Sequence, residues 1–318
     1  MTPRPAQPDE QVVRQAIAWM LRLRGQPDTG ALQACEHWRN QHASHELAWQ
    51  RVQQLDQELG VGLRALPQSR QVLEDARAGL RRRQALKLLS GAAVGGAALW
   101  LSRDLTPWER LTADLATATG ERHGQRLADG SRLLLNTDSA VDLRMTAGQR
   151  QVHLRRGEIL LEAAPQAEPL HLRSAQGWLR TRAARFVAQL DAGALRLCVL
   201  GGEVEVLHGG TGGRTVGAGR TVEVRAGEVR ELPPPAMEPG AWADGLIVTR
   251  DVRLGDFVAE VARYRPGRLA CSEAVADLRL SGVYRLDDTE RLLALLPQTL
   301  PVQLRYRTRW WVTVEARA

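Results

Sequence analysis

An uncharged apolar stretch divides the chain and restricts what it can fold into. Residues 88–101, with the sequence LLSGAAVGGAALWL, contain no ionisable side chain, and a helix through them can extend over residues 84–102. At 1.5 Å per residue such a helix is about 28 Å long, close to the thickness of the hydrocarbon core of a membrane. The sequence therefore predicts one transmembrane helix at residues 84–102. A buried helix in a soluble domain is the alternative.

Basic residues gather on one side of this stretch. Arg82, Arg83 and Lys87 precede or begin it, whereas on the other side Arg103 is followed at once by Asp104. Because loops on the cytoplasmic side carry the excess of positive charge, we expect a single-pass membrane protein. Its N-terminus would be cytoplasmic and its C-terminus periplasmic. The formal net charge of +7 then reflects this cluster more than a nucleic-acid-binding face.

The same segment has a second interpretation as an export or anchor signal. Arg82, Arg83, Leu86 and Lys87 stand before a mildly apolar helix, an arrangement that resembles a twin-arginine signal. A plain membrane anchor with flanking positive charge explains the same residues. The residues leave both interpretations open.

Residues 1–80 have the apolar spacing of short amphipathic helices. We expect helices at about 9–24 and 31–41, a third capped by Ser44 and a fourth capped by Ser69. Such a small helical domain has a limited core, which a partner helix could complete. Its tryptophans, Trp19, Trp38 and Trp49, are candidates both for core packing and for anchoring a protein partner.

Residues 103–235 change to a β pattern, with turn residues every eight to twelve positions. The expected strands are 131–136, 151–154, 158–162, 170–173, 185–190, 194–200 and 203–208. Pairs such as Asp129-Gly130 and Gly201-Gly202 supply the positive φ angles of tight turns. The predicted fold of this region is a periplasmic all-β sandwich or roll.

Residues 240–318, beyond the prolines at 233–235, alternate strands with two helices. Strands are expected at 245–249, 268–271, 278–284, 302–306 and 310–315, and helices at 254–264 and 288–296. This pattern predicts a small periplasmic α+β domain. The expected fold class is thus multidomain: an all-α N-terminal bundle, one transmembrane helix, a β sandwich or roll and an α+β domain.

Chemistry-bearing motifs are absent from the sequence. It contains no phosphate-binding loop, dinucleotide fingerprint, zinc spacing or nucleophile elbow, so we expect neither an enzyme nor a cofactor. The histidines at positions 37, 42 and 45 do not share one helical face and are expected to be solvated. Asp142, Glu158 and Glu162 alternate with apolar residues and are expected to face outward from their strands.

The three cysteines do not have the spacing of a metal site. Cys35 lies in a helical repeat and is expected to be a small buried apolar residue. Cys198 and Cys271 would share the periplasm, but each lies in or beside an apolar strand, which favours free thiols over a disulfide.

Three stretches resemble the FecR family of anti-sigma regulators. Residues 16–52, which include AIAWMLRLRG and HWRNQHASHELAWQRV, are similar to the N-terminal sigma-binding domain of that family. Residues 127–139 (LADGSRLLLNTDS), followed by 152–158 and 202–204, resemble its Leu-x-Asp-Gly-Ser and Leu-Asn-x-x-Ser strands. Residues 242–285 resemble its C-terminal region, which is similar to the short N-terminal domain of secretins and TonB-dependent transducers.

The resemblance implies a relay of three proteins. An outer-membrane TonB-dependent transducer of the ferric-siderophore type would signal to the C-terminal domain, where Leu254, Phe257 and Tyr264 are candidate contacts. Residues 1–80 would hold an extracytoplasmic-function sigma factor in the cytoplasm and release it after rearrangement or cleavage by envelope proteases. The family has no direct nucleic-acid partner, and the implied role concerns regulation of iron uptake.

The sequence departs from the family at one position. Many members carry Gly-Thr before Arg-Phe, where the threonine hydroxyl attacks the preceding peptide bond and the chain cleaves itself. Here Ala183 and Ala184 precede Arg185-Phe186, so the nucleophile is missing. We therefore expect no self-cleavage at this place.

Two other functions stay open at this point. A membrane-anchored scaffold protein of the envelope would need the same periplasmic domains without any role in transcription. A periplasmic enzyme on an anchor would need a nucleophile or an acid–base pair, and the sequence offers neither. A sigma-factor gene immediately upstream would favour the anti-sigma interpretation over the scaffold.

Overall fold

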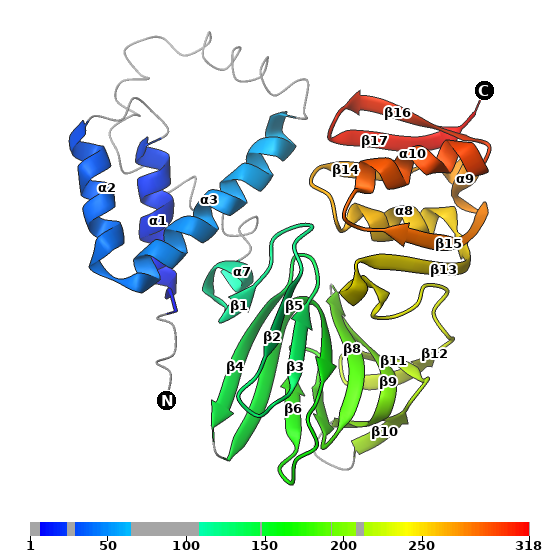
Figure 1. Cartoon of the computed structure of the whole chain (residues 1–318), viewed down its shortest axis with the longest axis horizontal. Helices are drawn as coiled ribbons and strands as arrows, with labels where there is room; N and C mark the ends of the chain where they lie inside the picture. The colour runs from blue at the N-terminus through cyan, green and yellow to red at the C-terminus, as the bar shows by residue number, and fades with distance from the viewer. Residues whose placement is uncertain are drawn as a thin grey trace. The chain divides into compact units, whose positions relative to one another are not determined.

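The computed structural model describes residues 7–23, 29–64, 108–146, 148–191, 193–207 and 213–317, drawn as coloured ribbon in Figure 1. They fall into two compact units, Met1–Thr112 and Ala113–Ala318. The first is helical, and the second joins a large β region to a smaller α+β region. Each unit has a hydrophobic core of its own.

The helical unit contains α1 (Glu10–Leu23), α2 (Thr29–Gln41), α3 (Ala43–Arg64) and α7 (Trp108–Thr112). The first three lie where the apolar spacing predicts helices; the fourth expected helix, from Ser69, lies outside the described residues. Asp9 caps α1 by accepting a 2.8 Å bond from the Val12 amide. At the start of α3 the cap is His42, whose Nδ1 accepts from the Ser44 amide at 3.2 Å, and not Ser44 as expected.

The transmembrane part of the expected fold class needs correction. None of the helices within the described residues has both the length and the apolarity needed to cross a membrane. The predicted span at residues 84–102 and its flanking residues Arg82, Arg83, Leu86 and Lys87 lie outside the described part. The observed fold is accordingly a helical unit and a mostly β unit.

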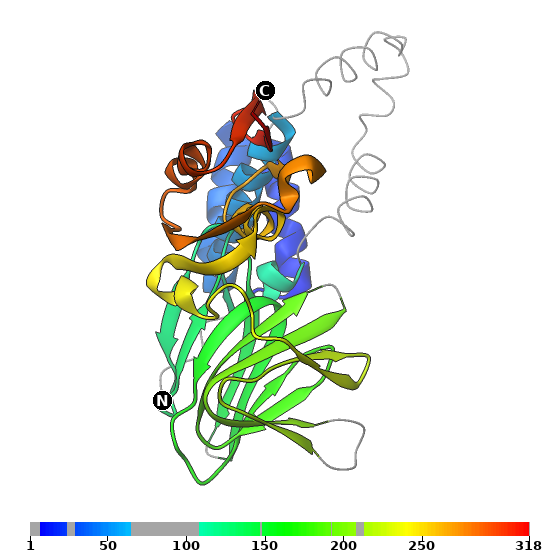
Figure 2. The same cartoon turned by 90° about the vertical axis from the view of Figure 1, so that its right-hand side faces the viewer.

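The β region is built on a 12-stranded sheet. Its strands are β1 (Leu115–Ala116), β2 (His123–Arg126), β3 (Arg132–Leu135), β4 (Ala140–Thr146), β5 (Gln149–Glu162), β6 (Leu170–Arg173), β7 (Trp178–Thr181), β8 (Ala184–Asp191), β9 (Ala194–Leu207), β10 (Gly213–Gly217), β11 (Thr221–Arg225) and β12 (Glu228–Leu232). The main path runs β1-β4-β5-β6-β7-β9-β11-β12, with β8 bridging β5 and β9. Figures 1 and 2 show that the sheet curls on itself. Its inward side chains form one buried apolar cluster.

Two long strands replace shorter ones that the turn signals predicted. β5 and β9 each run through 14 residues, whereas the sequence indicated two shorter strands in place of each. Gly157 (φ 83°) and Gly202 (φ 76°) adopt the left-handed conformation inside the strands rather than in hairpin turns. Each strand therefore bends and pairs with different neighbours on either side of its glycine, which lets the sheet curl.

The α+β region follows the expected alternation. It comprises the 3₁₀ turn η1 (Ala241–Asp244), β13 (Leu246–Arg253), α8 (Leu254–Ala262), β14 (Arg268–Cys271), α9 (Glu273–Ala276), β15 (Arg279–Arg285), α10 (Thr289–Thr299), β16 (Val302–Thr308) and β17 (Trp311–Ala316). β13 pairs with β15, and β14, β17 and β16 form a second small sheet. Asp288 caps α10 through the Arg291 amide at 2.9 Å.

A shared core joins the β region to the α+β region. Leu160, Val187 and Cys198 on the curled sheet belong to the same buried cluster as Leu254 and Phe257 of α8. At the junction Gly240 has φ 81°, and a Cβ there would lie 2.9 Å from Leu160 Cδ1. The prolines at 233–235 therefore connect two parts of one packed unit.

Candidate functional site

A buried carboxylate marks the junction between the β region and α8. Glu158 follows the bend of β5 at Gly157, where a Cβ would lie 2.3 Å from Ser139 Oγ, so only glycine fits. The Glu158 side chain is 8% exposed. The expectation that it faces solvent is wrong, because α8 and η1 cover this face of the strand.

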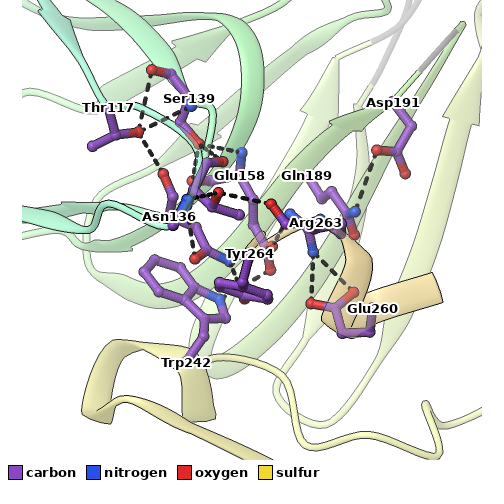
Figure 3. A network of polar contacts seen from close by, with 12 residues as sticks. Thr117, Asn136, Ser139, Glu158, Gln189, Asp191, Trp242, Glu260, Arg263 and Tyr264 are labelled. Carbon is purple, nitrogen blue, oxygen red and sulfur yellow. Dashed lines mark hydrogen bonds and ion pairs between the residues drawn. The ribbon is translucent and has the colours of Figure 1, made fainter. Parts of the chain in front are cut away.

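The Glu158 carboxylate accepts hydrogen bonds from three separate parts of the unit (Figure 3). Asn136 Nδ2, in the turn after β3, donates at 2.8 Å, and Arg263 Nη2, just after α8, donates at 2.6 Å. Trp242 Nε1 in η1 donates to the other oxygen at 2.9 Å. We call Asn136, Glu158, Trp242, Glu260, Arg263 and Tyr264 the Glu158 network.

Arg263 sits between two carboxylates. Its Nη1 donates to both oxygens of Glu260, at 2.8 and 3.0 Å, while Nη2 binds Glu158. Burial alone would lower the pKa of Arg263, but the charges of Glu158 and Glu260 outweigh it and raise that pKa. Burial raises the pKa of Glu260. The guanidinium therefore stays charged and compensates the two acids.

Tyr264 ties the turn after β3 to the end of α8. Asn136 Nδ2 donates to its hydroxyl at 2.7 Å, and Thr137 Oγ1 donates to the Arg263 carbonyl at 2.9 Å. Burial raises the pKa of Tyr264, so the phenol is neutral. Gly120 fits closely here, since a Cβ would lie 2.8 Å from the Tyr264 carbonyl oxygen.

A cleft of about 620 Å³ lies beside the network. Its lining includes Val187 and Cys198 of the sheet, the prolines at 233–235, and Glu260 and Arg263 of the network. The Glu158 oxygens already accept three bonds, and no cluster of metal-ligating side chains occurs among the described residues. The arrangement is suited to holding the β region and α8 together.

The comparisons with known proteins agree with this fold. Residues 113–205 match the sequence profile of the family described as FecR protein. This stretch carries a FecR domain. Residues 14–55 match a second profile, a domain of unknown function called DUF4880. The resemblance to the FecR family that the sequence predicts is thereby confirmed.

Solved structures add a likeness in fold. Two crystal structures of a proposed anti-sigma factor from Parabacteroides distasonis ATCC 8503 superpose with TM-scores of 0.53 and 0.52, at 17% and 16% sequence identity. The match covers 64% of this chain and 99% and 98% of those chains. No curated protein matches the chain in sequence.

The residues of the two motifs that resemble the FecR family form hydrogen bonds inside the folded domain. Asn136 of Leu-Asn-x-x-Ser holds Glu158, and Ser139 Oγ accepts the Glu158 amide at 2.9 Å. In Leu-x-Asp-Gly-Ser, Asp129 accepts from the Ser131 hydroxyl and from Arg150 Nε, both at 2.8 Å. These polar residues therefore satisfy one another inside the domain.

The three tryptophans proposed as partner anchors lie in the helical unit. Trp38 and Trp49 are buried in its core, and Trp19 is half-buried beside Arg22. Trp38 Nε1 donates to Gln15 at 3.0 Å and its ring stacks on His45. Leu21 and Leu32 are instead the large apolar side chains this unit leaves exposed among its described side chains.

The residues proposed to contact a transducer lie inside the α+β region. Leu254, Phe257 and Tyr264 are buried, the first two against the shared core and the third in the Glu158 network. In this conformation they support the fold and do not reach the surface.

The aligned self-cleavage position lies where β8 begins. Ala184 is buried and pairs with Gly202, and a Cβ on Gly202 would lie 2.5 Å from the Ala183 carbonyl oxygen. Neither alanine carries a hydroxyl that could act as the nucleophile. That the chain stays uncleaved is still a prediction.

The other residues singled out from the sequence are the three cysteines and two further acids. Cys198 and Cys271 are free, as is the buried Cys35. Asp142 binds Arg155 Nε at 2.5 Å, and Glu162 binds Arg185 Nε at 2.9 Å near the surface. One signal in the sequence could have singled out Glu158, namely the glycine before it. Gly157 permits a bend in the strand, after which side chains no longer alternate between buried and exposed.

Proposed function

We propose that this chain is an anti-sigma regulator of the FecR type. The observation that carries the proposal is the order of its parts: a DUF4880 match on a small helical unit, followed in the same chain by a FecR domain. The likeness in fold to the proposed anti-sigma factor of P. distasonis supports it. In this role the helical unit would bind an extracytoplasmic-function sigma factor.

The helical unit has the form that such binding needs. Its core is small and its exposed apolar side chains Leu21 and Leu32 could enter a groove on a partner. Because Trp38 and Trp49 fill the core, they would support the binding face rather than form it. A small helical unit of limited stability suits a partner that must be held and then released.

The signal would enter through residues 113–318. We propose a TonB-dependent outer-membrane transducer of the ferric-siderophore type as its source, with envelope proteases acting after the rearrangement. The Glu158 network supports a role in transmission, because it couples α8 to the FecR domain through charged, buried contacts.

The cellular location stays a prediction. We expect the helical unit in the cytoplasm and residues 113–318 in the periplasm, at the bacterial inner membrane. A reporter enzyme active only in the periplasm should work when fused after Asp104 and fail when fused after Leu66. The opposite result would exclude the relay.

Co-purification tests the central claim. The tagged full chain is co-expressed with each candidate sigma factor, and one of them should be retained. Leu32→Asp should reduce retention at least tenfold, while the matched exposed change Gln53→Asp on α3 should not. Two results together would favour the alternative of an envelope scaffold. No sigma factor is retained, and deleting the gene for this chain leaves transcription of a sigma-dependent reporter unchanged.

A further inference from the structure

The outer face of the second small sheet is left uncovered by the α+β region. On β14, β17 and β16 the side chains of Leu269, Val312, Val314 and Val302 are buried in the shared core beneath α8 and α10. Their neighbours in each strand point to the opposite face, because successive side chains alternate. That face carries Arg268, Trp311 and Arg305, which are exposed or half-buried.

Arginines dominate this face. The guanidinium groups of Arg268 and Arg307 lie 5.5 and 4.8 Å from the centre of the Trp311 ring. Arg305 is 63% exposed and only 3.8 Å from Glu315, the acid on this face. We call Arg268, Arg305, Arg307, Trp311 and Glu315 the arginine face; its three arginines exceed its one acid.

The same sheet has a free edge next to the arginine face. Within the described residues β16 pairs with β17 alone. The Arg317 amide donates to the Pro301 carbonyl, so residue 301 points its backbone groups toward β17. In an antiparallel pair every second residue does so, which places the odd-numbered residues of β16 toward β17. By that alternation the amide and carbonyl of Tyr306 point away from β17, and its side chain is 48% exposed.

We propose that the edge of β16 and the arginine face bind an extended, acidic polypeptide strand. The open edge supplies main-chain hydrogen bonds, as in β-strand addition, and the arginines select acidic side chains at alternate positions. The half-buried ring of Trp311 adds an aromatic contact beside these arginines. A membrane or nucleic acid would use the charge but not the backbone edge.

The test measures fluorescence anisotropy with the purified full chain. The probe is a fluorescein-labelled eight-residue peptide of alternating glutamate and valine, which should bind at least tenfold more tightly than its lysine–valine counterpart. Arg305→Glu with Arg307→Glu should reverse this preference. Arg132→Glu with Arg230→Glu, two exposed arginines on β3 and β12, should leave it unchanged.

A second pair of variants isolates the strand edge. Tyr306→Pro removes the outward amide and should weaken binding of the acidic peptide at least fivefold, whereas Tyr306→Val, which keeps the amide, should not. Equal binding of octaglutamate and the alternating peptide would overturn the strand-addition claim. Preferential binding to phosphatidylglycerol vesicles or to an oligonucleotide would overturn the choice of a polypeptide. None of these outcomes depends on whether a sigma factor co-purifies.

Discussion

Replacing Glu158 with glutamine should loosen α8 without unfolding the chain. Glutamine keeps the shape of the side chain but removes the charge. Its amide nitrogen is a donor and would face other donors, either Trp242 or the pair Asn136 and Arg263, so at least one hydrogen bond would be lost. Hydrogen bonds to a charged group contribute about 1.5–3 kcal/mol each, and breaking a buried pair costs about 3–5 kcal/mol. Arg263 keeps Glu260 as a partner and is partly exposed, so we expect a loss of about 2–3 kcal/mol.

Hydrogen exchange of α8 measures this loss. A change of about 2–3 kcal/mol corresponds to roughly 30–150-fold faster exchange of the amides in residues 254–262. The matched control is Glu162→Gln on the same strand, where the pair with Arg185 is largely exposed and worth at most about 1 kcal/mol. Equal exchange in the two variants would show that Glu158 does not hold α8 in place.

Further predictions concern Trp49, His171 and the chain at Ala184. Trp49→Ala should lower the free energy of unfolding of the helical unit by about 3–5 kcal/mol and reduce its far-ultraviolet circular dichroism, because the ring is buried. The exposed change Leu32→Ala should keep the helix signal, and a Trp49→Ala variant that stays helical would refute the core assignment. Burial and the charge of Arg180 lower the pKa of His171 below its unfolded value, so the unfolded chain binds the proton more readily. The free energy of unfolding should therefore fall as the pH drops through about 6.5. In urea titrations between pH 7.5 and 5.5, His171→Gln should show a smaller fall. The tagged chain should run as one band near its full 35.1 kDa, and an abundant fragment beginning at Ala184 would contradict the missing nucleophile, which Ala183→Gly with Ala184→Thr could restore.

Local pattern was sufficient for most elements of secondary structure. The apolar spacing of α1 and α8 and the alternation along β6 and β14 depend on one face being buried, a property that a short stretch of sequence carries by itself. The helix expected from residue 288 begins there in the structure, where Asp288 caps it by accepting from the Arg291 amide. The hallmark Asp129 and Ser131 likewise act within their own turn.

Contacts between distant segments decided the site. Asn136, Glu158 and Tyr264 are far apart in the sequence, and each has an ordinary local setting when considered alone. Alternation predicts which face of a strand a side chain points to, but whether that face meets solvent depends on what packs on it. The burial of Glu158 and of the proposed anchors Phe257 and Trp49 was therefore settled only by the elements that cover them.

The sequence by itself determined the order of the helical, β and α+β parts, the family of the β part and the loss of the self-cleavage hydroxyl at Ala184. These depend on the identity and spacing of neighbouring residues. Only the tertiary structure decided that β5 and β9 run unbroken through Gly157 and Gly202, that Glu158 lies inside, and that arginines share one open face. A left-handed glycine fits both a turn and a bent strand, and the pairing partners across the sheet select between them.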